Sequence, residues 1–171
     1  MSNQIVNDAV ARGVLWVNSS GNYAQQHWSG PWSNSVGVGL QTISVQSGST
    51  VQVALRWNDT WGGSCNDYDL GLFNPSGTLV ASSLSVQNCS GSSRPVERIT
   101  YAAPTSGTYQ IVVSQFSASG SQTLDLIATN NLPSPVASKS LAHPADNANP
   151  GMLSVGAVDW LFPTAIEPYS S

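Results

Sequence analysis

The residues whose types and spacing best fit a chemical role stand together in the tetrad Ser19-Ser20-Gly21-Asn22. The tetrad is reached through the apolar run Val14-Leu15-Trp16-Val17, which is typical of a buried strand. A buried strand that ends in Gly-Asn can direct a side-chain amide into a cleft, where it stabilises the oxyanion of an acyl-transfer intermediate. The alternative is that Gly-Asn is a turn that tolerates positive φ. Asn22 is therefore a candidate oxyanion donor.

A second set of chemically competent side chains is the carboxylates Asp59, Asp67 and Asp69, which belong to one expected inter-strand loop. Calcium takes six to eight oxygen ligands, and Asn58, Asn66 or backbone carbonyls could complete such a set. The alternative is that Asp67 and Asp69 cap a turn by accepting hydrogen bonds from backbone amides. The sequence thus predicts calcium as a possible cofactor, and we expect calcium to raise the melting temperature if it binds.

Cys65 and Cys89, the only cysteines, are both flanked by turn-forming residues. We expect a disulfide between them, which would stabilise the fold by about 3 kcal/mol through loop-closure entropy. The alternatives are two free thiols or, less well supported, a metal pair, for which no further Cys or suitably spaced His completes a zinc site. A disulfide would fit an oxidising compartment, and hence an extracellular protein.

The elements that must position Asn22 read as an amphipathic helix, a stop at Gly13 and a buried strand. This stretch resembles the helix and strand that precede the oxyanion-hole asparagine of the subtilisin family. A second stretch, with His143-Pro144-Ala145-Asp146, the run 152–159 and the run 166–171, resembles the next segment of that family. The resemblance implies a serine endopeptidase with a polypeptide substrate, in which Asn22 serves the oxyanion hole and Ser19, Ser20 and Gly21 line the cleft.

More than a hundred residues separate these two stretches, so we expect three parts. Residues 1–24 and 139–171 form a subtilisin-like segment with one helix and two neighbouring parallel strands, and residues 25–138 form an inserted domain. The triad motifs of the family are absent, since His27 and His143 do not stand in its histidine motif. The resemblance therefore implies that this chain is inactive alone and completes its site with the remainder of a peptidase domain.

The inserted stretch reads as mainly β, because apolar and polar residues alternate in seven short runs bounded by Gly and Pro. The runs are 41–45, 50–57, 69–73, 79–81, 97–101, 107–113 and 123–128. Val51, Val53, Leu55 and Trp57 share one face of their run, which places Trp57 in a core. About 110 residues suffice for two packed sheets. The predicted fold is thus a jelly-roll-like β-sandwich inserted into a partial α/β segment.

The insert also resembles the bacterial pre-peptidase C-terminal domain, a β-sandwich of secreted peptidases. The motifs that carry the likeness are the runs 55–59 and 67–77, which include Asp67-Tyr68-Asp69-Leu70, followed by Ala103-Pro104 and Gly107-Thr108-Tyr109. The domain that follows the catalytic unit in kexin-like enzymes has a similar architecture. In both families the module stands after the catalytic domain, whereas here it would interrupt one.

Composition limits the classes of partner. Charged residues make up only 8% of the chain and the net charge is −4, opposite in sign to a nucleic-acid footprint. No apolar run is long enough for a transmembrane helix, so the sequence indicates neither nucleic acid nor a membrane as a partner.

Two other functions remain open. One is a non-catalytic module that binds carbohydrate or protein, for which Trp28, Trp32 and Trp61 are candidate contact residues. The other is a purely structural insert that is stabilised by calcium and the disulfide.

Overall fold

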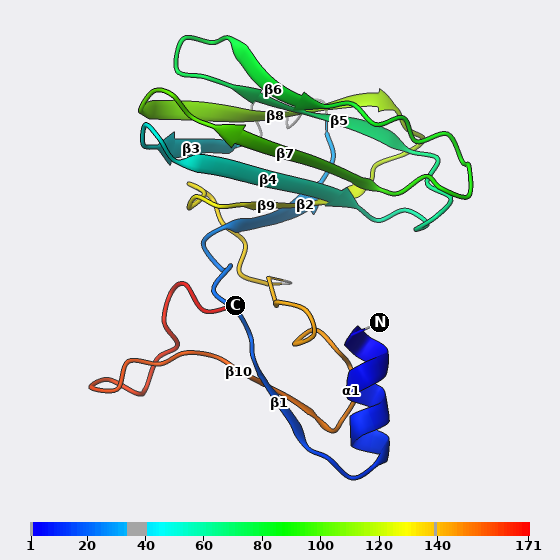
Figure 1. The fold of residues 1–171 in the computed structure, drawn as a ribbon, viewed down its shortest axis with the longest axis vertical. Coiled ribbons are helices and arrows are strands. Elements are labelled where there is room, and N and C mark those ends of the chain that lie inside the picture. The colour runs from blue at the N-terminus through cyan, green and yellow to red at the C-terminus, as the bar shows by residue number, and fades with distance from the viewer. Residues whose placement is uncertain (1, 34–40, 139) are drawn as a thin grey trace. The chain divides into compact units, whose positions relative to one another are not determined.

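The computed structural model describes residues 2–33, 41–138 and 140–171, which fall into two compact units (Figure 1). The first unit combines Met1–Gln25 with Val136–Ser171, and the second is the continuous stretch Gln26–Pro135. The chain therefore leaves the first unit after Gln25 and returns to it at Val136. The residue at which the last predicted segment begins, 139, lies outside the described residues.

The second unit is a sandwich of two four-stranded antiparallel sheets. Its strands are β2 (His27–Pro31), β3 (Gln41–Val45), β4 (Thr50–Trp57), β5 (Asp67–Phe73), β6 (Leu79–Ser83), β7 (Val96–Ala102), β8 (Gly107–Ser117) and β9 (Thr123–Ala128). One sheet has the order β2-β9-β4-β7 and the other β3-β8-β5-β6. This distribution of eight strands over two sheets is that of a jelly roll, which confirms the predicted β-sandwich.

The core of the sandwich follows from the alternation of apolar residues along its strands. Val51, Val53, Leu55 and Trp57 of β4 are all buried, with at most 2% of each side chain exposed. Tyr68 of β5 meets the ring of Trp57 edge-on, with ring centroids 5.3 Å apart. Because successive side chains of a strand point to opposite faces, each inner face is filled by every second residue.

The tryptophans expected in loops do not form an exposed row. Trp32 is buried and meets Tyr68 edge-on at 5.4 Å, and Trp28 lies in β2 and packs partly against the core. Only Trp61 among the three candidate contact residues is largely exposed. Trp28 was expected in a loop but lies in β2, because Gly30 and Pro31 are turn signals in isolation. Trp32 follows β2 outside any strand, as expected, but its side chain is buried.

The first unit contains α1 (Ser2–Ala11), β1 (Trp16–Ser19) and β10 (Met152–Val155). The two strands pair in parallel, with Trp16 opposite Met152 and Ser19 opposite Val155. Val6 of α1 is completely buried. Residue 151 must be glycine for the helix to pack, because a Cβ there would lie 2.3 Å from a methyl of Val10. One helix and two neighbouring parallel strands are thus present, as the sequence predicts.

One face of this small sheet is left uncovered within the unit. Val17 of β1 lies opposite Leu153 of β10, and Val155 is on the same face because it lies two residues after Leu153. All three side chains are about half exposed. Parallel sheets are normally covered on both faces, so an apolar and open face is unusual for a parallel pair. Among the described residues, no helix is long and apolar enough to cross a membrane.

Candidate functional site

Ser19, Ser20, Gly21 and Asn22 lie together at the carboxyl ends of the two parallel strands. They border a cavity of about 360 Å³, whose walls are residues 17–22, the turn 155–157 after β10, and Ser170. The carboxyl ends of parallel strands are where α/β sheets commonly bind ligands. The four candidate residues are thus placed beside one another and along one cavity.

The conformation of the tetrad depends on Gly21. Its φ is +102°, in the left-handed region, and a Cβ there would lie 2.8 Å from the Cβ of Ala142. The amide of Ala142 donates to the carbonyl of Ser20 at 2.7 Å, so the chain before β10 packs directly on this turn. A side chain at position 21 would therefore clash with Ala142 as well as strain the backbone.

Asn22 is exposed, and its side-chain amide makes no hydrogen bond with any described residue. The backbone on both sides of it, in contrast, is anchored. The carbonyl of Gly21 accepts from the amide of Ser171 at 2.9 Å, and the amide of Tyr23 donates to Ser171 Oγ at 2.9 Å. Asn22 therefore presents a free donor from a held backbone, which is the arrangement that an oxyanion site needs.

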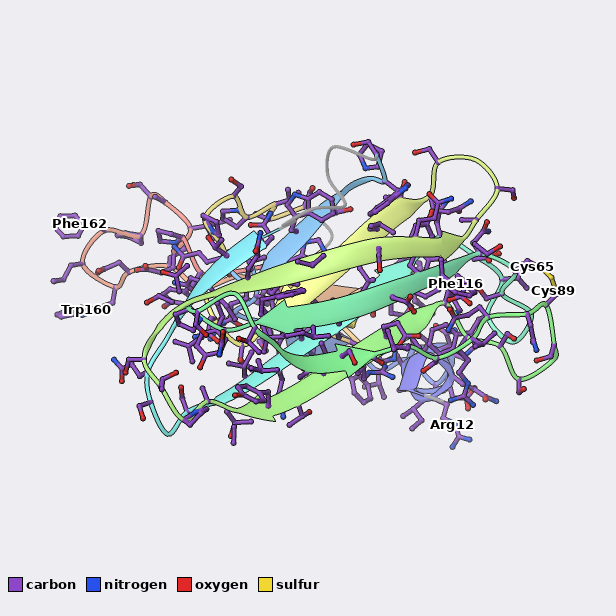
Figure 2. The ribbon with its side chains drawn as sticks, turned by 90° about the horizontal axis from the view of Figure 1, so that it is seen from above. Arg12, Cys65, Cys89, Phe116, Trp160 and Phe162 are labelled. Carbon is purple, nitrogen blue, oxygen red and sulfur yellow. A yellow bond between two sulfur atoms is a disulfide. The ribbon has the colours of Figure 1, made fainter. Side chains whose placement is uncertain are left out.

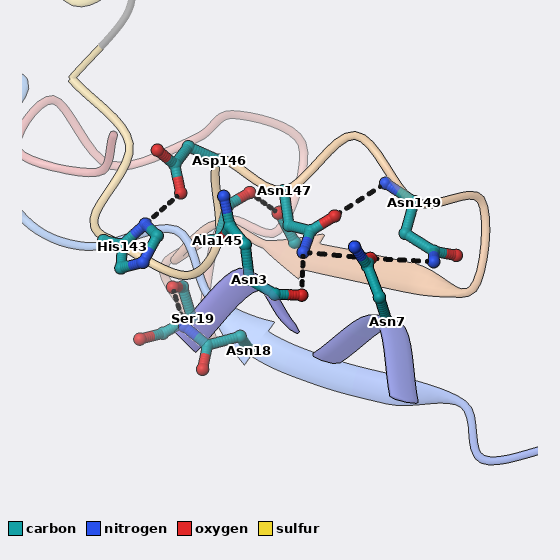
Figure 3. A network of polar contacts seen from close by, with 10 residues as sticks. Asn3, Asn7, Asn18, Ser19, His143, Ala145, Asp146, Asn147 and Asn149 are labelled. Carbon is teal, nitrogen blue, oxygen red and sulfur yellow. Dashed lines mark hydrogen bonds and ion pairs between the residues drawn. The ribbon is translucent and has the colours of Figure 1, made fainter. Parts of the chain in front are cut away.

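Behind the tetrad, polar contacts tie α1 to the turn before β10 (Figure 3). Asn147 Nδ2 donates to the carbonyl of Asn3 at 3.2 Å, and Asn149 Nδ2 donates to Asn7 Oδ1 at 2.9 Å. In the same turn His143 Nδ1 lies 2.7 Å from Asp146 Oδ1, and both side chains are about half exposed. This network positions the segment that packs on Gly21.

Asp59 organises the loop between β4 and β5 through its own carboxylate. Its Oδ2 accepts hydrogen bonds from Ser64 Oγ, from the amides of Cys65 and Asn66, and from Asn66 Nδ2, and its Oδ1 accepts from Thr60. Partial burial alone would raise the pKa of Asp59, but these donors together hold it well below its usual range. Asp59 thus caps the turns of this loop, a role that the sequence reasoning considered only for Asp67 and Asp69.

Asp67 and Asp69 lie in β5. Asp67 is almost completely buried, and its Oδ2 accepts from the amide of Gln87 at 3.2 Å while its Oδ1 has no hydrogen-bond partner. Burial raises the pKa of Asp67, and burial followed by the charges of Asp67 and Glu97 raises that of Asp69. Within the described part of the chain, no three His, Cys, Asp or Glu side chains are placed as a metal centre. Calcium at Asp59, Asp67 and Asp69 stays a prediction.

Glu97 is a buried residue that the sequence reasoning did not single out. Its Oε1 accepts from the amide of Ser85 and from Gln87 Nε2, both at 3.1 Å, and its Oε2 accepts from Ser83 Oγ. The signal was available, because Glu97 occupies an inward position of a strand whose next inward residue is Ile99. Ser170 and Ser171 were also missed as site residues, although they belong to the stretch that resembles the peptidase family.

Cys65 and Cys89 form the predicted disulfide at one end of the sandwich (Figure 2). The amide of Cys89 also donates to the carbonyl of Ser64 at 2.9 Å, so the bridge and a backbone hydrogen bond join the same two loops. The disulfide prediction is confirmed.

Comparison with known protein families finds a match within the second unit. Residues 40–115 match the family described as bacterial pre-peptidase C-terminal domain, so a domain of this kind is present in the chain. No curated protein matches the chain.

Solved structures give a likeness of fold. The structure of the Clostridium perfringens CspB protease matches with a TM-score of 0.60 at 13% identity, over 90% of this chain and 37% of that one. The pre-peptidase C-terminal domain of a Bacillus anthracis collagenase matches with a TM-score of 0.42 at 15% identity, over 66% of this chain and 94% of that domain. The chain therefore spans 37% of the length of the CspB protease chain, and its fold occurs within a protease.

Proposed function

We propose that this chain is the central part of a secreted subtilisin-like serine endopeptidase whose catalytic unit is interrupted by a jelly-roll domain. The Asp, His and Ser of the triad lie outside the chain, and Asn22 donates to the oxyanion while Ser19, Ser20 and Gly21 line the substrate cleft. The observation that carries the proposal is the free side-chain amide of Asn22, which stands on an anchored backbone beside the cavity at the ends of β1 and β10.

The open face of the small parallel sheet supports the same proposal. Val17, Leu153 and Val155 are half exposed on a face that parallel sheets normally bury. The remainder of a peptidase domain is the partner that would cover this face and extend the sheet. The likeness of fold to a much longer protease chain is consistent with such a remainder.

An extracellular setting is part of the proposal. The disulfide between Cys65 and Cys89 persists in oxidising compartments, and the chain has few charged residues. The jelly roll begins at Gln26, a few residues after Asn22, so it is placed in sequence to control access of large substrates or to brace the site.

The experiment that tests the proposal uses the full-length protein that contains this chain. We would compare the intact protein with a version in which residues 26–135 are replaced by a short Gly-Ser loop, on a small peptide substrate and on a large folded protein. Loss of activity on the protein substrate alone would indicate that the jelly roll controls access or docks the substrate. Equal loss of activity on both substrates would indicate that it stabilises the catalytic unit. An intact protein without activity on either substrate would contradict the peptidase proposal.

Calcium is a second, separate proposal for the jelly roll. The observation that favours it is the buried Oδ1 of Asp67, which no described donor satisfies. Its test is the melting temperature of the chain in calcium and in a chelator. A higher value in calcium, lost on substitution of Asp67 by Asn, would support a site, and identical melts would leave Asp67 and Asp69 as structural carboxylates.

A further inference from the structure

Ser171 holds the two peptide groups that flank Asn22. Its backbone amide donates to the carbonyl of Gly21 at 2.9 Å, and its hydroxyl accepts from the amide of Tyr23 at 2.9 Å. One residue thus contacts the chain immediately before and immediately after Asn22. The amide of Ala24 donates to the carbonyl of Tyr169 at 3.3 Å, which extends this contact by one more hydrogen bond.

Ser170, the neighbour of Ser171, contacts Ser20 and the turn after β10. Its hydroxyl accepts from the amide of Ala157 at 3.0 Å and lies 3.3 Å from the hydroxyl of Ser20, and both serines are buried. Ala157 belongs to the turn after β10, and Ser20 follows β1. The pair Ser170–Ser171 therefore links the ends of both parallel strands to the backbone of Asn22.

This anchoring matters because the other contacts of the turn, the packing of Ala142 on Gly21 and its hydrogen bond to Ser20, stop before Asn22. Gly21 has a positive φ and the wide backbone freedom of glycine, and the amide of Asn22 has no hydrogen bond with a described residue. A preorganised donor contributes to catalysis only while it is aimed at the oxyanion position, and a displacement of about 1 Å can cost on the order of a hundredfold in rate. Restraint must come from the peptide groups on either side of Asn22.

We propose that Ser171 is a positioning residue for Asn22, which acts by holding the Gly21 carbonyl and the Tyr23 amide so that the carboxamide of Asn22 points at the oxyanion. The inference rests on the proposed peptidase function. It assigns no contact between Ser171 and the substrate. Its hydroxyl group is the part that substitution can remove, because the bond from the Ser171 amide survives any replacement except proline.

The test is a double-mutant cycle in the full-length protein, with kcat and KM measured on a small peptide substrate. The variants are Ser171→Ala, Ser171→Thr, Asn22→Ala and the double variant Ser171→Ala/Asn22→Ala. Ser47→Ala is the matched control, since it also removes a hydroxyl that binds the backbone, at the carbonyl of Pro104, but belongs to the sandwich unit and not to the unit of Asn22. Hydrogen exchange of the Tyr23 amide reports the loss of the anchor independently of activity.

We expect Asn22→Ala to lower kcat by about a hundred- to a thousandfold, the usual cost of losing one oxyanion donor. Ser171→Ala should lower kcat by roughly tenfold, a misplacement smaller than a full 1 Å shift, with KM unchanged. Ser171→Thr, which keeps a hydroxyl, should restore most of that loss. In the Asn22→Ala background Ser171→Ala should have no further effect, because its only route to catalysis has been removed.

Other results would overturn the inference, each in a recognisable way. Unchanged kcat in Ser171→Ala, or an effect that persists in full without Asn22, would mean that Ser171 does not act through Asn22. Activity that is intact in Asn22→Ala would remove the site itself, and a wild-type protein without peptidase activity would remove the proposed function. If Ser171→Ala fails to fold, slow exchange of the Tyr23 amide in both the wild type and Ser171→Thr supports the anchor, and rapid exchange in both contradicts it.

Discussion

Asp59 shows how a single carboxylate can define a loop. Its five hydrogen bonds collect the donors of residues 60–66, and replacing it by Asn would put an amide donor against other donors. We expect Asp59→Asn to cost about 1–3 kcal/mol of stability, and so to lower the melting temperature by roughly 5 °C or more at pH 7.

The loss in Asp59→Asn should depend on pH in a defined direction. The pKa of Asp59 is lowered in the folded state, so its carboxylate stabilises the fold above the unfolded pKa of about 3.9, and that contribution fades as the pH falls below this value. Melting curves of the wild type and the variant should therefore converge on acidification from pH 5 towards pH 2. A difference that stays constant over this range would show that the hydrogen bonds, rather than the charge, carry the effect.

Asp69 should behave in the opposite way. Burial and the neighbouring carboxylates of Asp67 and Glu97 raise its pKa, so its ionised form costs stability above the folded pKa. Asp69→Asn should raise the melting temperature at pH 7, in chelator, by roughly 2 °C, and the gain should vanish below about pH 4, where Asp69 is protonated in both states. A lower melting temperature at pH 7 that appears only in calcium would instead support a cation at this cluster.

At the scale of elements, substitution can distinguish the stability that the disulfide contributes from the stability that the hydrogen bonds of the joined loops contribute. Replacing both Cys65 and Cys89 by Ser should cost about 3 kcal/mol, because the bridge closes a segment with a sequence separation of 24. We expect a clear fall in the melting temperature, and the same fall for the wild type under reductant. If the double variant has the same melting temperature as the wild type, the hydrogen bonds of Asp59 and the hydrogen bond between Cys89 and Ser64 hold these loops without the disulfide.

The strands differ in how far their own residues determine them. β3, β4 and β9 have the predicted bounds, because alternation between apolar and polar residues marks both their limits and their inner face. β2 was not predicted, since His27 to Pro31 contains no β-branched residue. It forms because it pairs with β9 from Gly30 opposite Leu124 to His27 opposite Ile127, a tertiary contact that no local pattern reveals.

The candidate site also combines a part that the local sequence predicts with a part that depends on tertiary contacts. The tetrad was found because an apolar strand followed by Gly-Asn has a local signature, although β1 is half exposed in this chain and not buried as the sequence predicts. The support of Asn22 by Ser171, in contrast, joins residues about 150 positions apart. The three aspartates show the limit of proximity in sequence. Asp59 accepts hydrogen bonds from the loop that follows it, while Asp67 lies in β5 and accepts a hydrogen bond from Gln87. Carboxylates that are close in sequence therefore need not point to one site.

At the scale of the whole molecule, the sandwich should be a domain that folds by itself. Its buried residues form one core cluster that lies between Trp32 and Leu132, inside the unit Gln26–Pro135. A unit of about 110 residues with a single core is within the size at which domains fold independently. We therefore expect residues 26–135, produced alone under oxidising conditions, to show a cooperative melt and dispersed amide resonances. Two substitutions test whether the isolated unit has the native core. Leu126→Ala, which removes a completely buried side chain, should lower the free energy of unfolding of the isolated unit by about 2–5 kcal/mol. Phe116→Ala, at a largely exposed position of the same unit, should change this free energy little. A non-cooperative melt of residues 26–135 would show that the sandwich needs its flanks, and the deletion of residues 26–135 would then have to be reinterpreted as damage to both units.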